Sequence, residues 1–369
     1  MKLPYVRTAV AATCAFLALQ ATTTPAHAYT LEVMGRHEWN GNYNDYYGFD
    51  NNQEGTTKIL ISTHDIYSGT DADGNEIWTP VPHISGIDAS DGVSVTLPEA
   101  VKFVFSTNDS RLDGKTFTLT DCSYQQFGFN WCDSENLSIT VPGCYTHLTG
   151  EFLASDRIRE ITLEASAPAI IWGNPYGASP KIIVNDNDVA AYRAKCDNNE
   201  DGWQSSFTIF AKSHRTKKTD VNSNAGGLYD AVKAAAGDDL RDVYNLKITG
   251  TIQPSDMNVF SQLPNLISID LSNVTINMSD GNAPYIWGCK DLYWLETVSL
   301  PSEVKGIYDN AFKECHNLSN INLDNITTIG EFAFRGCESL TEVSLPNIES
   351  IGSNSFSYCS NLHTATVGD

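Results

Sequence analysis

Three stretches near the carboxyl end of the chain decide the fold: Ile307–Cys315 reads IYDNAFKEC, Ile329–Cys337 reads IGEFAFRGC, and Ile351–Cys359 reads IGSNSFSYC. Each stretch begins with isoleucine, carries phenylalanine in its sixth position and ends with cysteine, and successive stretches lie 22 residues apart. A period of about 20–50 residues is typical of repeat proteins, in which each repeat buries its apolar edge against its neighbours. The spacing therefore predicts a solenoid.

Each repeat also predicts one short strand. A leucine follows each cysteine by three positions, and an alternating apolar pair comes after it, so two side chains face inward and one between them faces outward. These pairs are Leu246/Ile248, Ile269/Leu271, Val298/Leu300, Ile321/Leu323, Val343/Leu345 and Ala365/Val367. A fainter upstream series has similar spacing: Val95/Leu97, Phe117/Leu119, Ile139/Val141, Ile161/Leu163 and Ile182/Val184. We therefore expect two arrays of strands with repeats of about 22 residues.

The pattern I-x-x-x-A-F-x-x-C-x-x-L-x-x-[IV]-x-L resembles the BspA-like leucine-rich repeats of bacterial (Bacteroidetes-type) secreted and cell-surface proteins. The resemblance covers 295–369, continues back to 243 and extends with more departures over 93–184. Segment 160–203 is similar to the way such arrays close, and 225–250 is similar to the entry of a second array. The resemblance implies a β-rich leucine-rich repeat solenoid and an extracellular binding or adhesion role without known catalysis.

Composition shifts divide the chain into five expected segments. The second array should begin with a short capping helix, Leu228–Ala236, which Gly237 ends. The segments are a signal peptide (1–28), a β-rich leading or capping segment with one hairpin (29–92), a first, degenerate array with its closure (93–210), a polar linker (211–225) and the second array (226–369).

The amino-terminal residues have the features of a secretory signal. Lys2 and Arg7 precede an apolar run from Thr8 to Gln20, and Ala26–Ala28 gives an A-x-A site with cleavage after Ala28. No later segment approaches the ~20 consecutive apolar residues that a membrane-spanning helix needs. We therefore predict a secreted or cell-surface protein.

Composition excludes several classes of function. Of the 369 residues, 41% are hydrophobic and 18% charged, so the chain has enough apolar material for a packed core. The 45 acids against 23 bases give a net charge of −22, and residues 221–369 alone hold 18 acids against 7 bases. This excess would repel a phosphate backbone and favours basic or neutral partners.

The cysteines of the second array share one repeat position. We predict that Cys289, Cys315, Cys337 and Cys359 form a ladder of buried structural thiols under the turns. Adjacent rungs lie ~5 Å apart, so a disulfide across rungs stays open as an alternative. Cys132 and Cys144 could also pair.

Catalytic and metal-binding signatures are absent from the sequence, which predicts a non-enzymatic protein without metal or cofactor. Two acidic loops have some of the oxygen ligands of a calcium site. One contains Asp71, Asp73 and Asn75, and the other contains Asp197, Asn199 and Asp201. Both depart from the EF-hand pattern, in its glycine or in its last ligand, which favours ordinary turns.

The outward positions of the strands suggest a docking face. In the first array they read Thr96, Thr118, Thr140 and Thr162, and in the second Lys247, Asp270, Ser299, Asn322, Ser344 and Thr366. Aromatic residues flank an irregular repeat that carries additional residues, and such insertions tend to reach binding faces. The candidate binding face is Trp287, Tyr293, Trp294, Asn322, Ser344 and Thr366. The expected partner is an extracellular or cell-surface protein; the alternative is a glycan, bound by the threonine column and the aromatic stretch 39–49.

Overall fold

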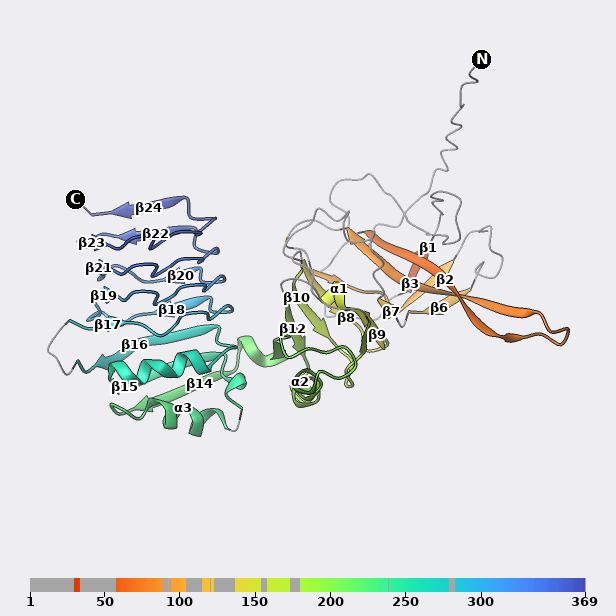
Figure 1. Cartoon of the computed structure of the whole chain (residues 1–369), viewed down its shortest axis with the longest axis horizontal. Coiled ribbons are helices and arrows are strands. Elements are labelled where there is room, and N and C mark those ends of the chain that lie inside the picture. Colours follow the sequence, from red (N-terminus) through yellow and green to blue (C-terminus); the bar gives the residue numbers. More distant parts are fainter. Residues whose placement is uncertain are drawn as a thin grey trace, which may run out of the picture. The chain divides into compact units, whose positions relative to one another are not determined.

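The computed structural model describes residues 30–33, 58–88, 92, 94–103, 115–119, 121–122, 137–153, 158–172, 180–237, 239–278 and 283–368. The predicted signal peptide (1–28) and the aromatic stretch 39–49 therefore lie outside the described residues. The chain divides into two compact units, 1–211 and 212–369. Figure 1 shows stacked strands in both, and each unit is described by itself.

One side of the second unit is a parallel sheet, here called the front sheet. Its strands are β14 (Lys218–Ser223), β15 (Asn245–Ile252), β16 (Ser268–Ile276), β18 (Thr297–Ser299) and β20 (Asn320–Ile321). The parallel pair β22 (Glu342–Leu345) and β24 (Thr364–Val367) continues the stack above β20 (Figure 1). All six apolar pairs predicted for this array begin in these strands. Ala365 and Val367 are nevertheless exposed, because β24 pairs only with β22 among the described residues.

A second parallel sheet, the back sheet, closes the rungs that begin with β16, β18, β20 and β22, and the sequence pattern does not predict it. It contains four two-residue strands: β17 (Tyr285–Ile286), β19 (Gly306–Ile307), β21 (Thr328–Ile329) and β23 (Ser350–Ile351). The core lies between the two sheets. Within it Phe312, Phe334 and Phe356 stack almost parallel, with ring centroids 5.4 and 5.2 Å apart. The repeated phenylalanine is therefore a continuous column that joins successive rungs.

The amino-terminal end of the second array contains the predicted helix. α3 (Leu228–Ala236) buries Leu228 and Val232 against the core, and Gly237 follows it with φ of 88°. Short 3₁₀ helices follow at η3 (Leu240–Asp242) and η4 (Pro254–Gln262). The helix therefore supplies apolar cover near the first rungs, as the sequence predicts.

The prediction of a polar linker over 211–225 is wrong. Residues 212–215 form the 3₁₀ helix η2 (Lys212–Arg215), and β14 pairs in parallel with β15 over six residues. Alternate residues Thr219, Val221 and Ser223 are buried. The strand is hidden in the composition because only Val221 among its buried positions is strongly apolar.

The first unit has the same two-sided plan. One parallel sheet contains β4 (Ser94–Thr96), β8 (Leu137–Val141), β10 (Ile158–Leu163), β12 (Lys181–Val184) and β13 (Ile209–Ala211). The other contains β2 (Lys58–Thr70), β3 (Glu76–Asp88), β7 (Asp121–Cys122), β9 (His147–Thr149) and β11 (Ile170–Trp172). The short helix α1 (Gly150–Leu153) follows β9. Four of the five predicted upstream pairs lie in the first of these sheets.

The pair Phe117/Leu119 does not form a rung of this sheet, so that part of the prediction is wrong. β6 (Thr116–Thr118) pairs antiparallel with β5 (Ala100–Phe103), which also pairs with β1 (Thr30–Val33). β4 pairs directly with β8 instead. The spacing of 22 residues is accidental here, because the chain turns back after β5 rather than advancing by one rung.

Two further elements define the ends of the first unit. β2 and β3 form the hairpin predicted in the leading segment, with Asp71–Asn75 as its turn. α2 (Val189–Asn198) covers the core at the other end and buries Val189, Tyr192 and Cys196. The Tyr192 hydroxyl donates to the Ala165 carbonyl at 2.9 Å, and the Trp203 indole N–H donates to the Ala169 carbonyl at 2.8 Å. These bonds fix the closing segment to the last rungs.

Candidate binding face

The outward side chains of the front sheet lie in register from strand to strand. Asp220 stands opposite Lys247, Lys247 opposite Asp270, and Asp270 opposite Ser299. In the next pairs Asn322 follows Ser299, and Ser344 stands opposite Thr366. All are polar, and Asn322, Ser344 and Thr366 are exposed. These outward positions, here called the polar column, run along the front sheet and continue on the separate pair β22 and β24.

Within this column some groups are bonded to the array itself. The Asn322 side chain accepts a hydrogen bond from Leu300 N at 2.6 Å and donates one to the Leu300 carbonyl at 3.1 Å. Asn322 thus joins one rung to the preceding rung, and its amide has less capacity for a ligand. Lys247 and Asp270 form an ion pair at 3.7 Å, in which both side chains stay partly exposed. The Thr366 hydroxyl donates to the Val343 carbonyl of the preceding rung at 3.5 Å. Ser344 and Thr366 are both exposed at the surface.

Two aromatic side chains lie at the edge of the front sheet, just before β18. Tyr293 and Trp294 precede β18, with ring centroids 4.7 Å apart, and Tyr293 also lies 4.9 Å from the His316 ring. Trp294 is buried, whereas Tyr293 is exposed. Partial burial, and secondarily the nearby Glu338 carboxylate, raise the pKa of Tyr293, so its hydroxyl remains a neutral donor and acceptor. Only Tyr293 of this pair can therefore contact a partner directly.

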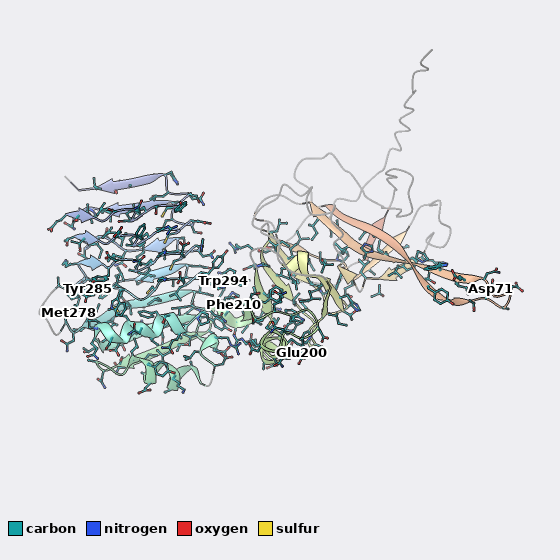
Figure 2. The ribbon with its side chains drawn as sticks, in the orientation of Figure 1. Asp71, Glu200, Phe210, Met278, Tyr285 and Trp294 are labelled. Carbon is teal, nitrogen blue, oxygen red and sulfur yellow. The ribbon has the colours of Figure 1, made fainter. Side chains whose placement is uncertain are left out.

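Trp287 lies on a different part of the rung. It directly follows β17 of the back sheet and packs half-buried against the core. Tyr285 of the same strand and Trp294 lie at opposite edges of the array in Figure 2. The six residues predicted as one binding face are thus divided: Tyr293, Trp294, Asn322, Ser344 and Thr366 belong to the front sheet or its edge, and Trp287 does not.

The back sheet carries its own aromatic pair, which the sequence did not single out. Tyr285 and Tyr308 stack with ring centroids 5.1 Å apart and an interplanar angle of 26°, and Tyr308 is exposed. Gly306 lies in β19, and Gly330 directly follows β21. A Cβ at Gly330 would collide with the backbone of Tyr308 and Asp309. Neighbouring residues of the array therefore pack directly against both glycines.

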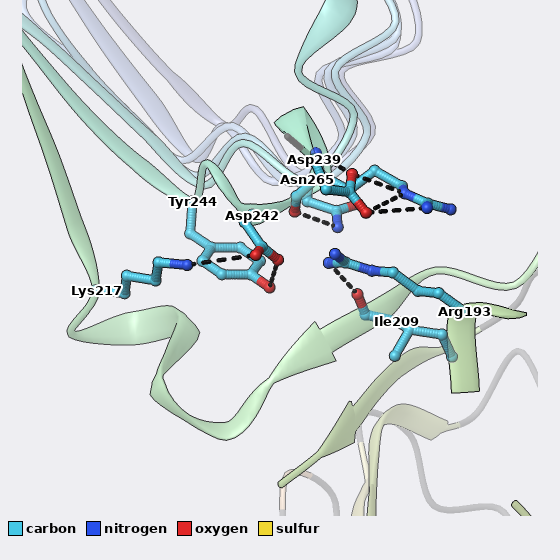
Figure 3. A network of polar contacts seen from close by, with 8 residues as sticks. Arg193, Ile209, Lys217, Asp239, Asp242, Tyr244 and Asn265 are labelled. Carbon is cyan, nitrogen blue, oxygen red and sulfur yellow. Dashed lines mark hydrogen bonds and ion pairs between the residues drawn. The ribbon is translucent and has the colours of Figure 1, made fainter. Parts of the chain in front are cut away.

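A polar network fixes the entry of the second array (Figure 3). Asp242 accepts a hydrogen bond from the Tyr244 hydroxyl at 3.4 Å and pairs with Lys217 at 3.5 Å. The Arg241 guanidinium pairs with Asp239 at 2.9 Å, and Asn265 donates to the Arg241 carbonyl at 2.8 Å. These contacts join residues before β15 to the following rung, so the polar residues here have a structural role.

The four repeat cysteines lie inside the second array as free thiols. Cys315 Sγ donates to the Cys289 carbonyl at 2.9 Å, Cys337 Sγ to the Phe312 carbonyl at 3.2 Å, and Cys359 Sγ to the Phe334 carbonyl at 3.1 Å. Burial raises the pKa of Cys315 to about 12 and that of Cys359 to about 11. Cys144 is also a free thiol, and Cys132 lies outside the described residues.

The threonine column of the first array is shorter than predicted. Thr96, Thr140 and Thr162 stand in register, but Thr118 belongs to the separate three-stranded sheet. The same column continues into Ile183 and Phe210, which are buried. A polar platform along the whole array is therefore ruled out, and the three aligned threonines are only half exposed.

In both acidic loops, carboxylate oxygens are bonded to nearby groups of the protein. Asp71 accepts bonds from Asp73 N, Asn75 N and Asn75 Nδ2 at 2.8–3.0 Å. In the second loop Lys195 pairs with Asp201 at 2.7 Å and with Glu200 at 2.8 Å. No group of three or more His, Cys, Asp or Glu side chains suited to a metal occurs in the described part of the chain.

Two facing parallel ladders that recur about every 22 residues define a leucine-rich repeat solenoid. Residues 289–369 match the family described as "BspA type Leucine rich repeat region", in six copies. These carboxyl-terminal rungs are therefore BspA-type leucine-rich repeats. A comparison with curated proteins gives no match. No helix of the described residues is long and apolar enough to cross a membrane.

Several solved bacterial structures are similar. A leucine rich cell surface protein from Faecalibacterium prausnitzii A2-165 is 16% identical with a TM-score of 0.21, over 83% of this chain and 52% of that chain. This chain thus spans about half of that protein. A leucine-rich repeat protein from Bacteroides ovatus ATCC 8483 is 13% identical with a TM-score of 0.26, over 82% of this chain and 89% of that one. The pneumococcal vaccine antigen PcpA is 13% identical with a TM-score of 0.23, over 84% and 80%.

Proposed function

We propose that the protein is a non-enzymatic, secreted or cell-surface binding protein, which docks an extracellular protein on the front sheet of its second array. The observation that carries the proposal is the exposed polar column that ends in Ser344 and Thr366, with Tyr293 at its edge. Tyrosine is enriched in protein interfaces, and polar side chains form much of the surface around such contacts. The acidic excess of residues 221–369 favours a basic or neutral partner.

The position in the fold supports binding rather than chemistry. The nucleophilic side chains of the repeats, Cys289, Cys315, Cys337 and Cys359, are buried, and their pKa values are raised. Thiolate is the reactive form of cysteine, so these groups serve packing. Export, which the proposal requires, rests on the predicted signal peptide and cleavage after Ala28.

The test is a matched pair of double variants measured by surface plasmon resonance against purified extracellular-matrix proteins. Ser344→Arg with Thr366→Arg places two long side chains on the front sheet and should weaken binding at least about tenfold. Thr328→Arg with Ser350→Arg makes the same change on the back sheet, where both residues are also exposed. Equal binding by the two double variants would refute the front sheet as the docking face.

A glycan ligand is the second candidate, and the stacked pair Tyr285 and Tyr308 favours it. Exposed aromatic faces bind the apolar faces of sugar rings, and Tyr308 is 54% exposed. This function predicts that Tyr308→Ala abolishes retardation of the protein in gels containing soluble polysaccharides. Retention of polysaccharide binding by that variant would exclude the tyrosine pair.

A further inference from the structure

The β2–β3 hairpin of the first unit has a distal part that is exposed on both faces. From Tyr67 to Thr79 every residue except the half-buried Gly69 is exposed. Figure 1 shows the hairpin extending beyond the other described strands of its unit, and Figure 2 places Asp71 at its tip. We call residues 67–79 the hairpin tip.

The hairpin tip carries three large apolar side chains. Tyr67, Ile77 and Trp78 are 54%, 44% and 45% exposed. Tyr67 stands opposite Trp78, and their rings meet edge to face with centroids 5.7 Å apart. The Trp78 indole N–H donates to Glu76 at 3.2 Å, which sets the ring orientation. Grouped exposed apolar side chains mark interaction sites, and Trp and Tyr are the residues that contribute most to interfaces.

The apolar side chains lie on both faces of the ribbon. Adjacent residues of a strand point to opposite faces, so Ile77 lies on the face away from Tyr67 and Trp78. A membrane plane, a flat protein surface or a single stacked sugar can cover only one face. A cleft covers both at once, and the shape of the tip therefore selects a concave partner.

The charge of the hairpin tip further limits the kind of partner that it can bind. The tip holds three acids, Asp71, Asp73 and Glu76, and no Lys, Arg or His. Hydrogen bonds, first from the Asn75 side chain, lower the pKa of Asp71, so this carboxylate stays ionised down into the acid range. Three negative charges beside the apolar side chains of the hairpin tip are complementary to a cleft with a positively charged rim. Anionic lipid headgroups would repel the same charges.

We propose that the hairpin tip is a second docking element, which inserts into an apolar cleft with a basic rim on another protein. This element is separate from the front sheet of the second array. A variant that affects one surface should therefore leave binding through the other unchanged.

The experiment uses the full chain with the photo-crosslinker p-benzoylphenylalanine in place of the exposed Thr70, presented to purified extracellular-matrix proteins. Crosslinked peptides are identified by mass spectrometry, and affinity for the crosslinked protein is then measured. We expect the crosslink to fall in a sequence with apolar residues flanked by Lys or Arg. Trp78→Ala and Ile77→Thr should each weaken binding at least about tenfold, and Asp73→Lys should do the same at low salt.

Controls separate docking from folding. Trp78→Phe keeps an aromatic ring and should cost less than about threefold, whereas Tyr229→Ala removes an equally exposed ring from α3 and should cost nothing. Parallel assays use vesicles of anionic or neutral lipid and soluble polysaccharides. The proposal is overturned if position 70 gives no protein crosslink, if vesicles or polysaccharides bind through Trp78 instead, or if Ile77→Thr or Asp73→Lys binds as the natural protein does.

Discussion

Cys315 and Cys337 show how one residue type recurs for a structural reason. Each thiol lies in the core at the same depth of its rung and donates to a carbonyl of the preceding repeat. A small side chain with a weak donor satisfies that carbonyl without the desolvation cost of a hydroxyl. Cysteine therefore recurs at this repeat position because of its size and its hydrogen bond, and not because of its reactivity.

Thiol labelling measures this burial directly. In the folded protein at pH 8 we expect iodoacetamide to modify the half-buried Cys144 well before Cys315 or Cys337, because reaction needs an accessible thiolate. Peptide mapping by mass spectrometry gives the rate for each cysteine. Labelling of Cys315 at the rate of Cys144 would contradict the buried ladder.

Stability should depend on pH through the same groups. Burial raises the pKa of Cys315 to about 12, above its value in the unfolded chain, so its contribution is complete at neutral pH and decreases as the pH rises. Above about pH 9 each such thiol should cost about 1.4 kcal/mol of unfolding free energy per pH unit. Urea unfolding of the natural protein and of Cys315→Ala at pH 8 to 11 measures the contribution of Cys315 to the pH dependence of the unfolding free energy. A difference between the two proteins that does not change with pH would reject it.

At the scale of elements, two glycines with the same φ angle differ in their surroundings. Gly250 in β15 and Gly237 after α3 both have φ of 88°. A Cβ at Gly250 would collide with the Ser223 carbonyl of β14, whereas nothing lies within 4 Å at Gly237. Gly237→Ala should therefore cost about 1 kcal/mol for backbone strain alone, and Gly250→Ala about 2 kcal/mol or more. Urea unfolding of both variants measures the two losses of unfolding free energy. Equal losses would show that β14 moves to accommodate the new side chain.

The phenylalanine column gives a second comparison between elements. Phe334 stacks on a ring above and a ring below, whereas Phe356 stacks on Phe334 and is only partly buried. Phe334→Ala should lower the unfolding free energy by about 3–5 kcal/mol. Phe356→Ala should lower it by about 1–2 kcal/mol, because it removes less buried area. Thermal or urea unfolding measures the two losses of unfolding free energy. A larger loss for Phe356→Ala than for Phe334→Ala would contradict this prediction.

How much of the fold the sequence predicts depends on how strongly each strand alternates. Val343 and Leu345 are both buried in β22, and such pairs identify the front-sheet strands. The back sheet escapes detection because its strands are two residues long, with one buried isoleucine in each of β17, β19 and β21. Phe117 and Leu119 have the right period but the wrong partner. A one-dimensional pattern carries no information on whether a strand pairs parallel or antiparallel.

The candidate site is predicted less completely. Tyr293 was identified through the irregular repeat, and the structure leaves it exposed at the edge of the front sheet. Trp294 differs by one position and is buried, because neighbouring residues in a turn point in different directions. Tyr67 and Trp78 were not identified, although apolar residues on both sides of an Asp-Gly turn indicate a hairpin. Their exposure depends on how far the hairpin extends beyond the packed strands, and sequence alone does not give that length.

At the scale of the whole molecule, the division at residue 211 predicts where the chain can be cut. A fragment of residues 212–369 should fold on its own, because it keeps β14 and the bonds from Asn245 to the His214 and Lys217 carbonyls. A fragment of residues 226–369 lacks β14 and exposes the edge of β15. It should lose several kcal/mol or fail to fold. Circular dichroism and urea unfolding compare the two, and equal stability would make β14 dispensable.

The rungs of the second array are joined by hydrogen bonds that run along the stack, such as those from Gly330 N to the Ile307 carbonyl and from Gly352 N to the Ile329 carbonyl. A pull along that direction loads one interface between rungs at a time rather than many bonds in shear. The array should therefore lengthen in small, even steps, each releasing about 22 residues or roughly 70–80 Å of extended chain. In the surface role proposed above, such an array would act under flow as an extensible tether, which lengthens gradually under load.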